Sequence, residues 1–85
     1  MKIVFMGTSE FSVPSLQKIQ EAEHEIIGVI TQPDRPRGRG QKLIPSPIKE
    51  FALHQGLEIY QPERIKDEAA IDHVRSWDPD LVVVV

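Results

Sequence analysis

Four short apolar runs divide the chain, and their spacing constrains the fold more than any other feature. They are rich in valine and isoleucine, which favour strands, and they occupy residues 3–6, 25–31, 57–60 and 81–85. Helical patterns of about ten residues separate them. Parallel strands require crossovers of this kind, so we predict an α/β fold: a Rossmann-like, mostly parallel sheet with helices on both faces, with the chain ending at its fourth strand.

The three helices expected between these strands have recognisable ends. The first should begin near Ser12, and the second at Ser46, an N-cap followed by proline at the first helical position. Gly56 should end the second helix, and Asp67 should cap the third. The side chains expected to face the sheet are Val13, Leu16 and Ile19, then Ile48, Phe51 and Ala52, then Ala70, Ile71, Val74 and Trp77.

Residues 31–47 interrupt this pattern. They hold four of the seven prolines and two of the five glycines, residues that weaken helices and strands, so we predict a long loop. Residues 34–49 carry five cations and one anion, a net charge of +4 in a chain of net charge −3. This asymmetry favours an anionic partner, and a solvated linker is the alternative. The guanidinium group of arginine forms paired hydrogen bonds with phosphate, and residues 33–47 contain no aromatic residue for base stacking. We therefore favour contact with a phosphate backbone.

Length and composition limit the other possibilities. Eighty-five residues make one domain at most, and the absence of cysteine excludes a disulfide framework or a thiolate metal site. The N-terminal apolar run is too short for a signal peptide or a membrane span, so we expect a cytoplasmic protein without a membrane partner. Residues 81–85 are expected to form a strand buried on both faces. Because no turn follows them, we expect the chain to be the N-terminal piece of a longer protein.

The turn after the first strand is the expected ligand site, because ligands of parallel α/β sheets bind at the carboxyl ends of the strands. Gly7 is followed there by a helix N-terminus, which attracts anions. Serines replace two glycines of the G-x-G-x-x-G pattern, at Ser9 and Ser12, and Glu10 would repel a pyrophosphate. The turn is therefore not expected to bind NAD or FAD.

No catalytic or metal-binding group stands out in the sequence. His24, His54 and His73 lack metal-ligand spacing, and we predict structural or surface roles for them, with His73 on a helix exterior. No serine lies in a G-x-S-x-G motif. We therefore expect no catalytic, cofactor-binding or metal-binding residue within residues 1–85. If the parent protein is an enzyme, its acid–base residues should lie beyond Val85.

Four stretches carry a resemblance to a known family. The segments KIVFMGTSEFSVPSL, GVITQPDRPRGRGQKLIPSPIKEFA, YQPERIKD and PDLVVVV resemble the N-terminal domain of the methionyl-tRNA formyltransferases, from Lys2 to Val85. The resemblance implies transfer of a formyl group from 10-formyltetrahydrofolate to the amino group of methionyl-initiator tRNA, for translation initiation. It also implies a formyltransferase fold, of which residues 1–85 would be the N-terminal portion, with the rest of that domain and a C-terminal domain absent.

The resemblance also implies roles for particular residues. The basic segment would contact the tRNA acceptor arm, most directly through Arg39 and Lys42, with Arg35 and Arg37 as auxiliary contacts. The turn would form part of a pocket for the aminoacyl end, lined by Gly7, Thr8, Ser9 and Phe11. The catalytic residues and the folate site would lie beyond residue 85, so the 85 residues alone should be inactive. Implied partners are the initiator tRNA and the folate, without DNA or metal.

Two residues depart from the family pattern, and two other functions stay open. Ser9 stands where proline is usual, and Arg37 where a small residue is frequent, which could alter affinity. Other formyltetrahydrofolate-dependent formyltransferases, acting on glycinamide ribonucleotide or sugar nucleotides, share the fold, but the basic loop argues against them. A non-catalytic nucleic-acid-binding module is the alternative from a different class.

Overall fold

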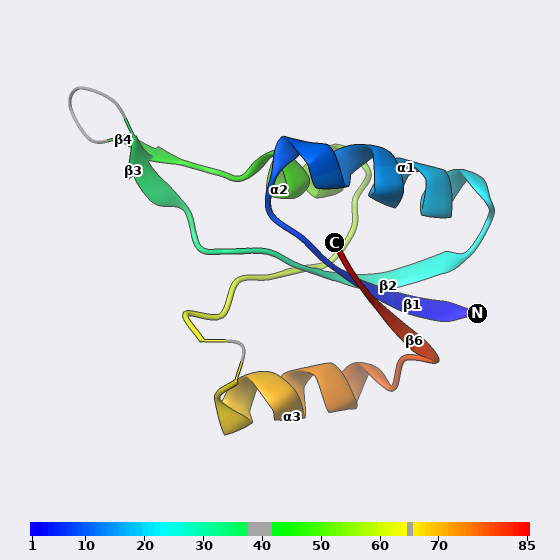
Figure 1. The fold of residues 1–85 in the computed structure, drawn as a ribbon. Coiled ribbons are helices and arrows are strands. Elements are labelled where there is room, and N and C mark those ends of the chain that lie inside the picture. Colours follow the sequence, from blue (N-terminus) through cyan, green and yellow to red (C-terminus); the bar gives the residue numbers. More distant parts are fainter. Residues whose placement is uncertain (38–41, 65) are drawn as a thin grey trace.

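The computed structural model describes residues 1–37, 42–64 and 66–85, with the backbone alone for residues 35–37 and 42 (Figure 1). Strands and helices alternate along the main fold, as the apolar spacing predicts. In chain order the elements are β1 (Lys2–Met6), the short 3-10 helix η1 (Glu10–Ser12), α1 (Val13–Glu21), β2 (Glu25–Ile30), β3 (Arg35–Arg37), β4 (Lys42–Ile44), α2 (Pro47–His54), β5 (Ile59–Tyr60), α3 (Glu68–Trp77) and β6 (Leu81–Val84).

Four strands form one sheet in the order β5-β2-β1-β6, and each neighbouring pair is parallel. Helices α1 and α2 cover one face of this sheet, and α3 lies against the other (Figure 1). The chain builds outward from β1 through β2 to β5 and then returns to the far side of β1. The predicted Rossmann-like fold, with a parallel sheet and helices on both faces, is confirmed.

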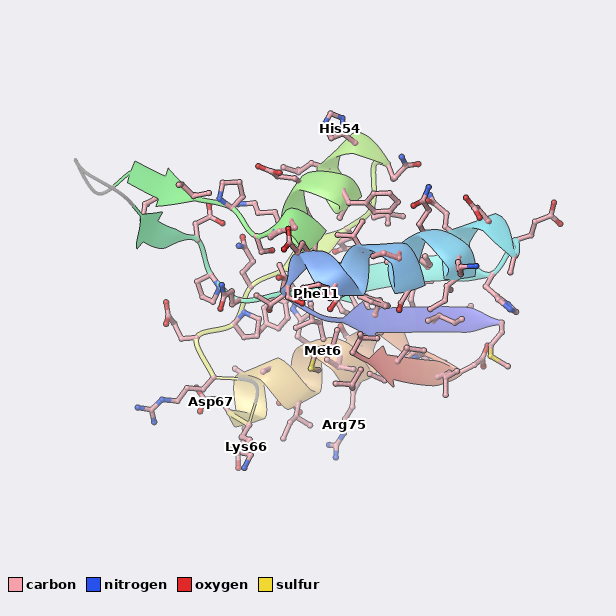
Figure 2. All side chains as sticks on the ribbon, turned by 45° about the horizontal axis from the view of Figure 1, so that its top comes forward. Met6, Phe11, His54, Lys66, Asp67 and Arg75 are labelled. Atoms are coloured by element: carbon pink, nitrogen blue, oxygen red, sulfur yellow. The ribbon has the colours of Figure 1, made fainter. Side chains whose placement is uncertain are left out.

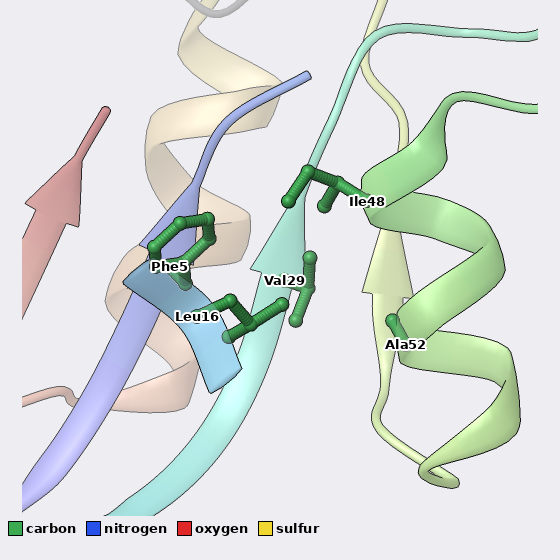
Figure 3. Packing of buried hydrophobic residues seen from close by; sticks show 5 residues of the cluster. All are labelled: Phe5, Leu16, Val29, Ile48 and Ala52. Atoms are coloured by element: carbon green, nitrogen blue, oxygen red, sulfur yellow. The ribbon is translucent and has the colours of Figure 1, made fainter. Parts of the chain in front are cut away.

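The main core lies between the sheet and helices α1 and α2. Phe5 of β1 and Val29 of β2 pack with Leu16 of α1 and with Ile48 and Ala52 of α2, and all five side chains are fully buried (Figure 3). These residues come from elements far apart in the chain, and Phe5 is paired with Val29 in the register of β1 and β2, so their side chains lie on the same face of the sheet. The predicted inward faces of α1 and α2 are therefore confirmed.

The opposite face of the sheet is closed by an aromatic side chain against a glycine. A Cβ atom on Gly28 of β2 would lie only 2.6 Å from two ring carbons of Trp77 in α3, so the strand accepts the ring because no side chain stands there. Trp77 also meets His73 edge-on, and His73 stacks on Tyr60 with ring centroids 3.9 Å apart. The predicted exterior position of His73 is wrong, because the ring is held between Tyr60 and Trp77.

The ends of the helices follow local sequence rules. Ser46 caps α2, since its Oγ accepts a hydrogen bond from the backbone N–H of Lys49 at 3.1 Å. Gly56 follows α2 with a φ of 69°, a left-handed conformation that favours glycine. Asp67 occupies the N-cap position of α3 as predicted, but its side chain makes no capping hydrogen bond. The predicted start of α1 near Ser12 and the predicted start and end of α2 are confirmed.

Residues 31–47 are not a loop throughout. Arg35–Arg37 and Lys42–Ile44 pair as antiparallel strands β3 and β4, with Pro36 opposite Leu43. We call this pair the ribbon, and it extends away from the main sheet (Figure 1). The prediction of a loop is wrong here because proline is excluded from central strands but tolerated at sheet edges, and both strands of a two-stranded sheet are edges.

Burial of the later elements also differs from the prediction. Strand β6 was expected to be buried on both faces, but Val84 is 68% exposed, and among the described strands β6 pairs only with β1. Ile71 of α3 was expected to face the sheet and is 41% exposed. An apolar run indicates a strand, but its burial depends on which elements cover it, and that is set by the tertiary structure. Strand β5 comprises only Ile59–Tyr60 and is therefore shorter than the strand predicted at residues 57–60.

Candidate functional site

The turn after β1 lies where the carboxyl ends of β1 and β2 meet. Gly7 is buried there, and its backbone N–H donates to the carbonyl of Ile30 at 3.0 Å. A Cβ atom at Gly7 would lie 3.0 Å from Phe5 Cε1 and from Ser12 Cβ. Glycine therefore allows the chain to turn directly from the strand into η1, with little space between them.

A hollow of about 330 Å³ lies beside this turn, lined by Thr8, Ser9, Glu10, Phe11 and Pro47. The structure thus brings together three of the four residues that the resemblance places around the aminoacyl end: Thr8, Ser9 and Phe11. Gly7, the fourth, does not line the hollow. Phe11 is 81% exposed although its side chain is large and apolar (Figure 2).

A second hollow, of about 210 Å³, adjoins the first at Thr8. Its walls come from the ends of β1 and β2 and from the segment after β5: Met6, Thr8, Ile30, Thr31, Gln32, Pro33, Pro62 and Glu63. The sequence did not indicate this hollow, because its walls come from segments far apart in the chain that the pairing of β2 with β5 brings together. Both hollows lie at the carboxyl ends of the strands, where ligands of parallel α/β sheets bind.

A chain of hydroxyl groups crosses the floor of this region. The hydroxyls of Thr31 and Ser46 lie 2.7 Å apart and are both buried, and Thr31 also lies 3.5 Å from the hydroxyl of Thr8. Thr8 accepts a further hydrogen bond from the backbone N–H of Gln32 at 3.3 Å. These contacts tie the turn after β1 to the end of β2 and to the start of α2.

An ion pair lies at the base of the ribbon, beside the hydroxyl chain. Lys49 Nζ donates to both carboxylate oxygens of Asp34, at 3.1 and 2.9 Å, and Gln61 Nε2 donates to Asp34 Oδ1 at 2.9 Å. Gln61 also donates to the carbonyl of Gln32 at 3.1 Å. The amide of Gln61, followed by the ammonium of Lys49, holds the pKa of the Asp34 carboxyl below its ordinary value.

Of the four predicted tRNA-binding cations, the structure places three in the ribbon. Arg35 and Arg37 belong to β3 and Lys42 to β4, so the ribbon carries these three along its two strands. Arg39 lies outside the described residues. Lys49, which contributed to the predicted +4 charge, is paired with Asp34, so the ribbon itself carries the basic character.

Residues 1–37, 42–64 and 66–85 contain no group of three or more histidine, aspartate or glutamate side chains placed to hold a metal ion. No helix within these ranges has both the length and the apolar character needed to cross a bilayer.

Comparison with known proteins identifies the family to which this fold belongs. The family model for formyl transferases matches residues 1–85. The chain belongs to the formyl transferase family.

Similar proteins within that family carry a more particular name. The methionyl-tRNA formyltransferase of Clostridioides difficile is 53% identical over 85 residues, which are 100% of this chain and 28% of that protein. Those of Fusobacterium nucleatum and Moorella thermoacetica are 58% and 54% identical, each over 100% of this chain and 27% of their own length. The resemblance predicted from the sequence is confirmed, and the chain spans little more than a quarter of these relatives.

Proposed function

We propose that residues 1–85 are the N-terminal portion of the catalytic domain of a methionyl-tRNA formyltransferase that acts in the cytoplasm. The observation that carries this proposal is the 53–58% identity, over the whole chain, to relatives of that name. The rest of the catalytic domain and a C-terminal domain would follow in the full-length protein. The basic ribbon favours this substrate over the smaller substrates of other formyltransferases.

The proposed reaction moves a formyl group between two substrates. The amine nitrogen of methionyl-initiator tRNA attacks the formyl carbon of 10-formyltetrahydrofolate and forms the new C–N bond. The bond from that carbon to the folate nitrogen breaks. The amine loses one proton, the folate nitrogen gains one, and tetrahydrofolate leaves. Residues beyond Val85 would stabilise the oxyanion and move the proton. The 85 residues would supply binding for the tRNA.

The basic segment, residues 31–47, and the hollow beside Phe11 would each bind a different part of the tRNA. Arg39 and Lys42 would contact acceptor nucleotides, supported by Arg35 and Arg37, because guanidinium groups form paired hydrogen bonds with phosphate. The aminoacyl end would enter the hollow lined by Thr8, Ser9 and Phe11, above Gly7. The exposed Phe11 ring offers an apolar wall there, a use that would explain its exposure.

The role of the basic segment, residues 31–47, is tested by Arg39→Ala in the full-length enzyme. Loss of a charged hydrogen bond should lower kcat/KM for the tRNA by roughly 5- to 150-fold, corresponding to about 1–3 kcal/mol, and leave the KM for the folate unchanged. The salt dependence of tRNA binding should also become shallower. Initial-rate kinetics with each substrate varied in turn provide the measurement.

Arg75→Ala is the matched control, because it removes the same charge from α3 on the opposite side of the sheet, where Arg75 is exposed (Figure 2). This variant should leave both kinetic constants unchanged. Equal effects of Arg39→Ala on tRNA and folate would contradict the proposed role of the basic segment.

A nucleic-acid-binding module without chemistry is the second candidate, favoured by the basic ribbon alone. The two functions differ in the residues beyond Val85, where the enzyme should carry an Asn-x-His motif and then an aspartate. The 85-residue chain by itself should show no formyl transfer above background when incubated with both substrates. Turnover by this chain would overturn the placement of the catalytic residues downstream.

A further inference from the structure

We infer that Asp34, Lys49 and Gln61 are positioning residues that fix the direction in which the ribbon leaves the domain. We call these three residues the clasp. The inference rests on the proposed function, in which the ribbon contacts a tRNA. The clasp would hold the ribbon in the orientation that binds the tRNA.

The clasp joins three parts of the chain at the point where the ribbon begins. Asp34 immediately precedes β3, Lys49 belongs to α2, and Gln61 follows β5. Lys49 Nζ and Gln61 Nε2 together place three hydrogen bonds on the Asp34 carboxylate. Gln61 also holds the carbonyl of Gln32, two residues before Asp34. The segment that enters the ribbon is therefore held by one side chain from α2 and by one from the segment after β5.

The strand that leaves the ribbon is tied down separately. Ser46 lies two residues after the end of β4, and its buried hydroxyl lies 2.7 Å from that of Thr31, one residue after β2. The entering and leaving segments thus meet at a buried contact, and the clasp holds the entering segment again further out. Two points of attachment determine a direction, whereas one would leave the ribbon able to swing about it.

The partial exposure of the clasp argues that orientation is its principal effect. The side chains of Asp34 and Lys49 are 27% and 21% exposed. An ion pair that solvent still reaches adds little to overall stability, but several charged hydrogen bonds on one carboxylate restrict its position closely. Small displacements of a binding group can cost much of its contribution to substrate use.

Simple electrostatics and positioning predict opposite effects for the loss of Asp34. Asp34→Ala removes a negative charge beside a basic ribbon, so charge alone would strengthen tRNA binding. Loss of the clasp instead frees the ribbon, and tRNA use should weaken. Gln61→Ala provides a second variant without any change of charge, for which electrostatics predicts no effect and positioning again predicts weaker use.

The test uses the full-length enzyme carrying Asp34→Ala or Gln61→Ala, with Asp72→Ala as the control. Asp72 carries the same charge on the exposed surface of α3, where it lies 4.0 Å from Arg75. Both clasp variants should raise the KM for methionyl-tRNA roughly ten- to hundredfold, leave the KM for 10-formyltetrahydrofolate within about twofold, and speed hydrogen–deuterium exchange in β3 and β4. Asp72→Ala should change none of these.

The outcomes separate this inference from the proposed function. If the unaltered enzyme formylates methionyl-tRNA but Asp34→Ala binds it as well or better, the clasp does not position the ribbon. If the KM rises while exchange in β3 and β4 stays unchanged, Asp34 acts on the tRNA directly and the inference is overturned. If the unaltered enzyme does not formylate methionyl-tRNA, the proposed function fails, and the positioning role for tRNA fails with it.

Discussion

Ser46→Ala should destabilise the domain more than any ordinary surface substitution, because one hydroxyl serves two purposes. Its Oγ caps α2 by accepting from the N–H of Lys49, and it lies 2.7 Å from the buried hydroxyl of Thr31. Loss of a serine cap costs about 1 kcal/mol. A buried hydroxyl left without its partner costs about 1–3 kcal/mol, and here the lower part applies because Thr31 retains a longer contact with Thr8. We expect a total of roughly 2–3 kcal/mol.

Urea unfolding of the full-length protein, followed by far-ultraviolet circular dichroism, measures this change in the free energy of unfolding. Asp67→Ala is the matched control, since Asp67 holds the N-cap position of α3 but makes no capping hydrogen bond. Its cost should stay below about 1 kcal/mol, from the lost charge near a helix N-terminus. The double variant Ser46→Ala with Thr31→Val should cost less than the sum of the single changes, because no hydroxyl is then left unpaired. Equal costs for Ser46→Ala and Asp67→Ala, or strict additivity, would refute the reasoning.

Two further predictions concern the opposite face of the sheet and the clasp. Gly28→Ala should lower the free energy of unfolding by about 1–3 kcal/mol in a urea titration, because the new Cβ would lie 2.6 Å from the Trp77 ring. The double variant with Trp77→Leu should lose less than the sum of the two single losses, and strict additivity would contradict the contact between Gly28 and Trp77. The Asp34 carboxyl has a pKa below its ordinary value of 3.8, so its contribution to stability is fully present above about pH 4 and is lost as the pH falls through the folded-state pKa. Asp34→Asn should therefore flatten the fall in unfolding free energy below pH 4, and an unchanged slope would show that the clasp is not charged.

The clasp and the ribbon change the interpretation of the basic segment. Counting charges along the sequence assigned Lys49 to the cations that would attract a phosphate backbone. In the structure Lys49 pairs with Asp34, so this pair has an internal role, and the other described cations of residues 34–49, Arg35, Arg37 and Lys42, belong to the ribbon. The exposed Phe11 ring and the exposed side chains of β6 likewise became visible only once the elements were packed.

Local rules within the sequence were enough to determine the order of the four strands of the main sheet and of the three helices between them, the parallel arrangement of those strands and most helix ends. Ser46 before a proline and Gly56 with its positive φ act through their immediate neighbours, and apolar spacing depends only on the repeat of each element. The resemblance to methionyl-tRNA formyltransferases was also present in the residues themselves.

Only the tertiary structure decided the contacts between residues distant in the chain. Asp34 meets Lys49 and Gln61, 15 and 27 positions away, and His73 stacks on Tyr60 across the connection to α3. The ribbon formed despite its proline because both of its strands are edges. Pairing across such separations depends on how the sheet places its strands and helices, and that arrangement has no local signature in the residues concerned.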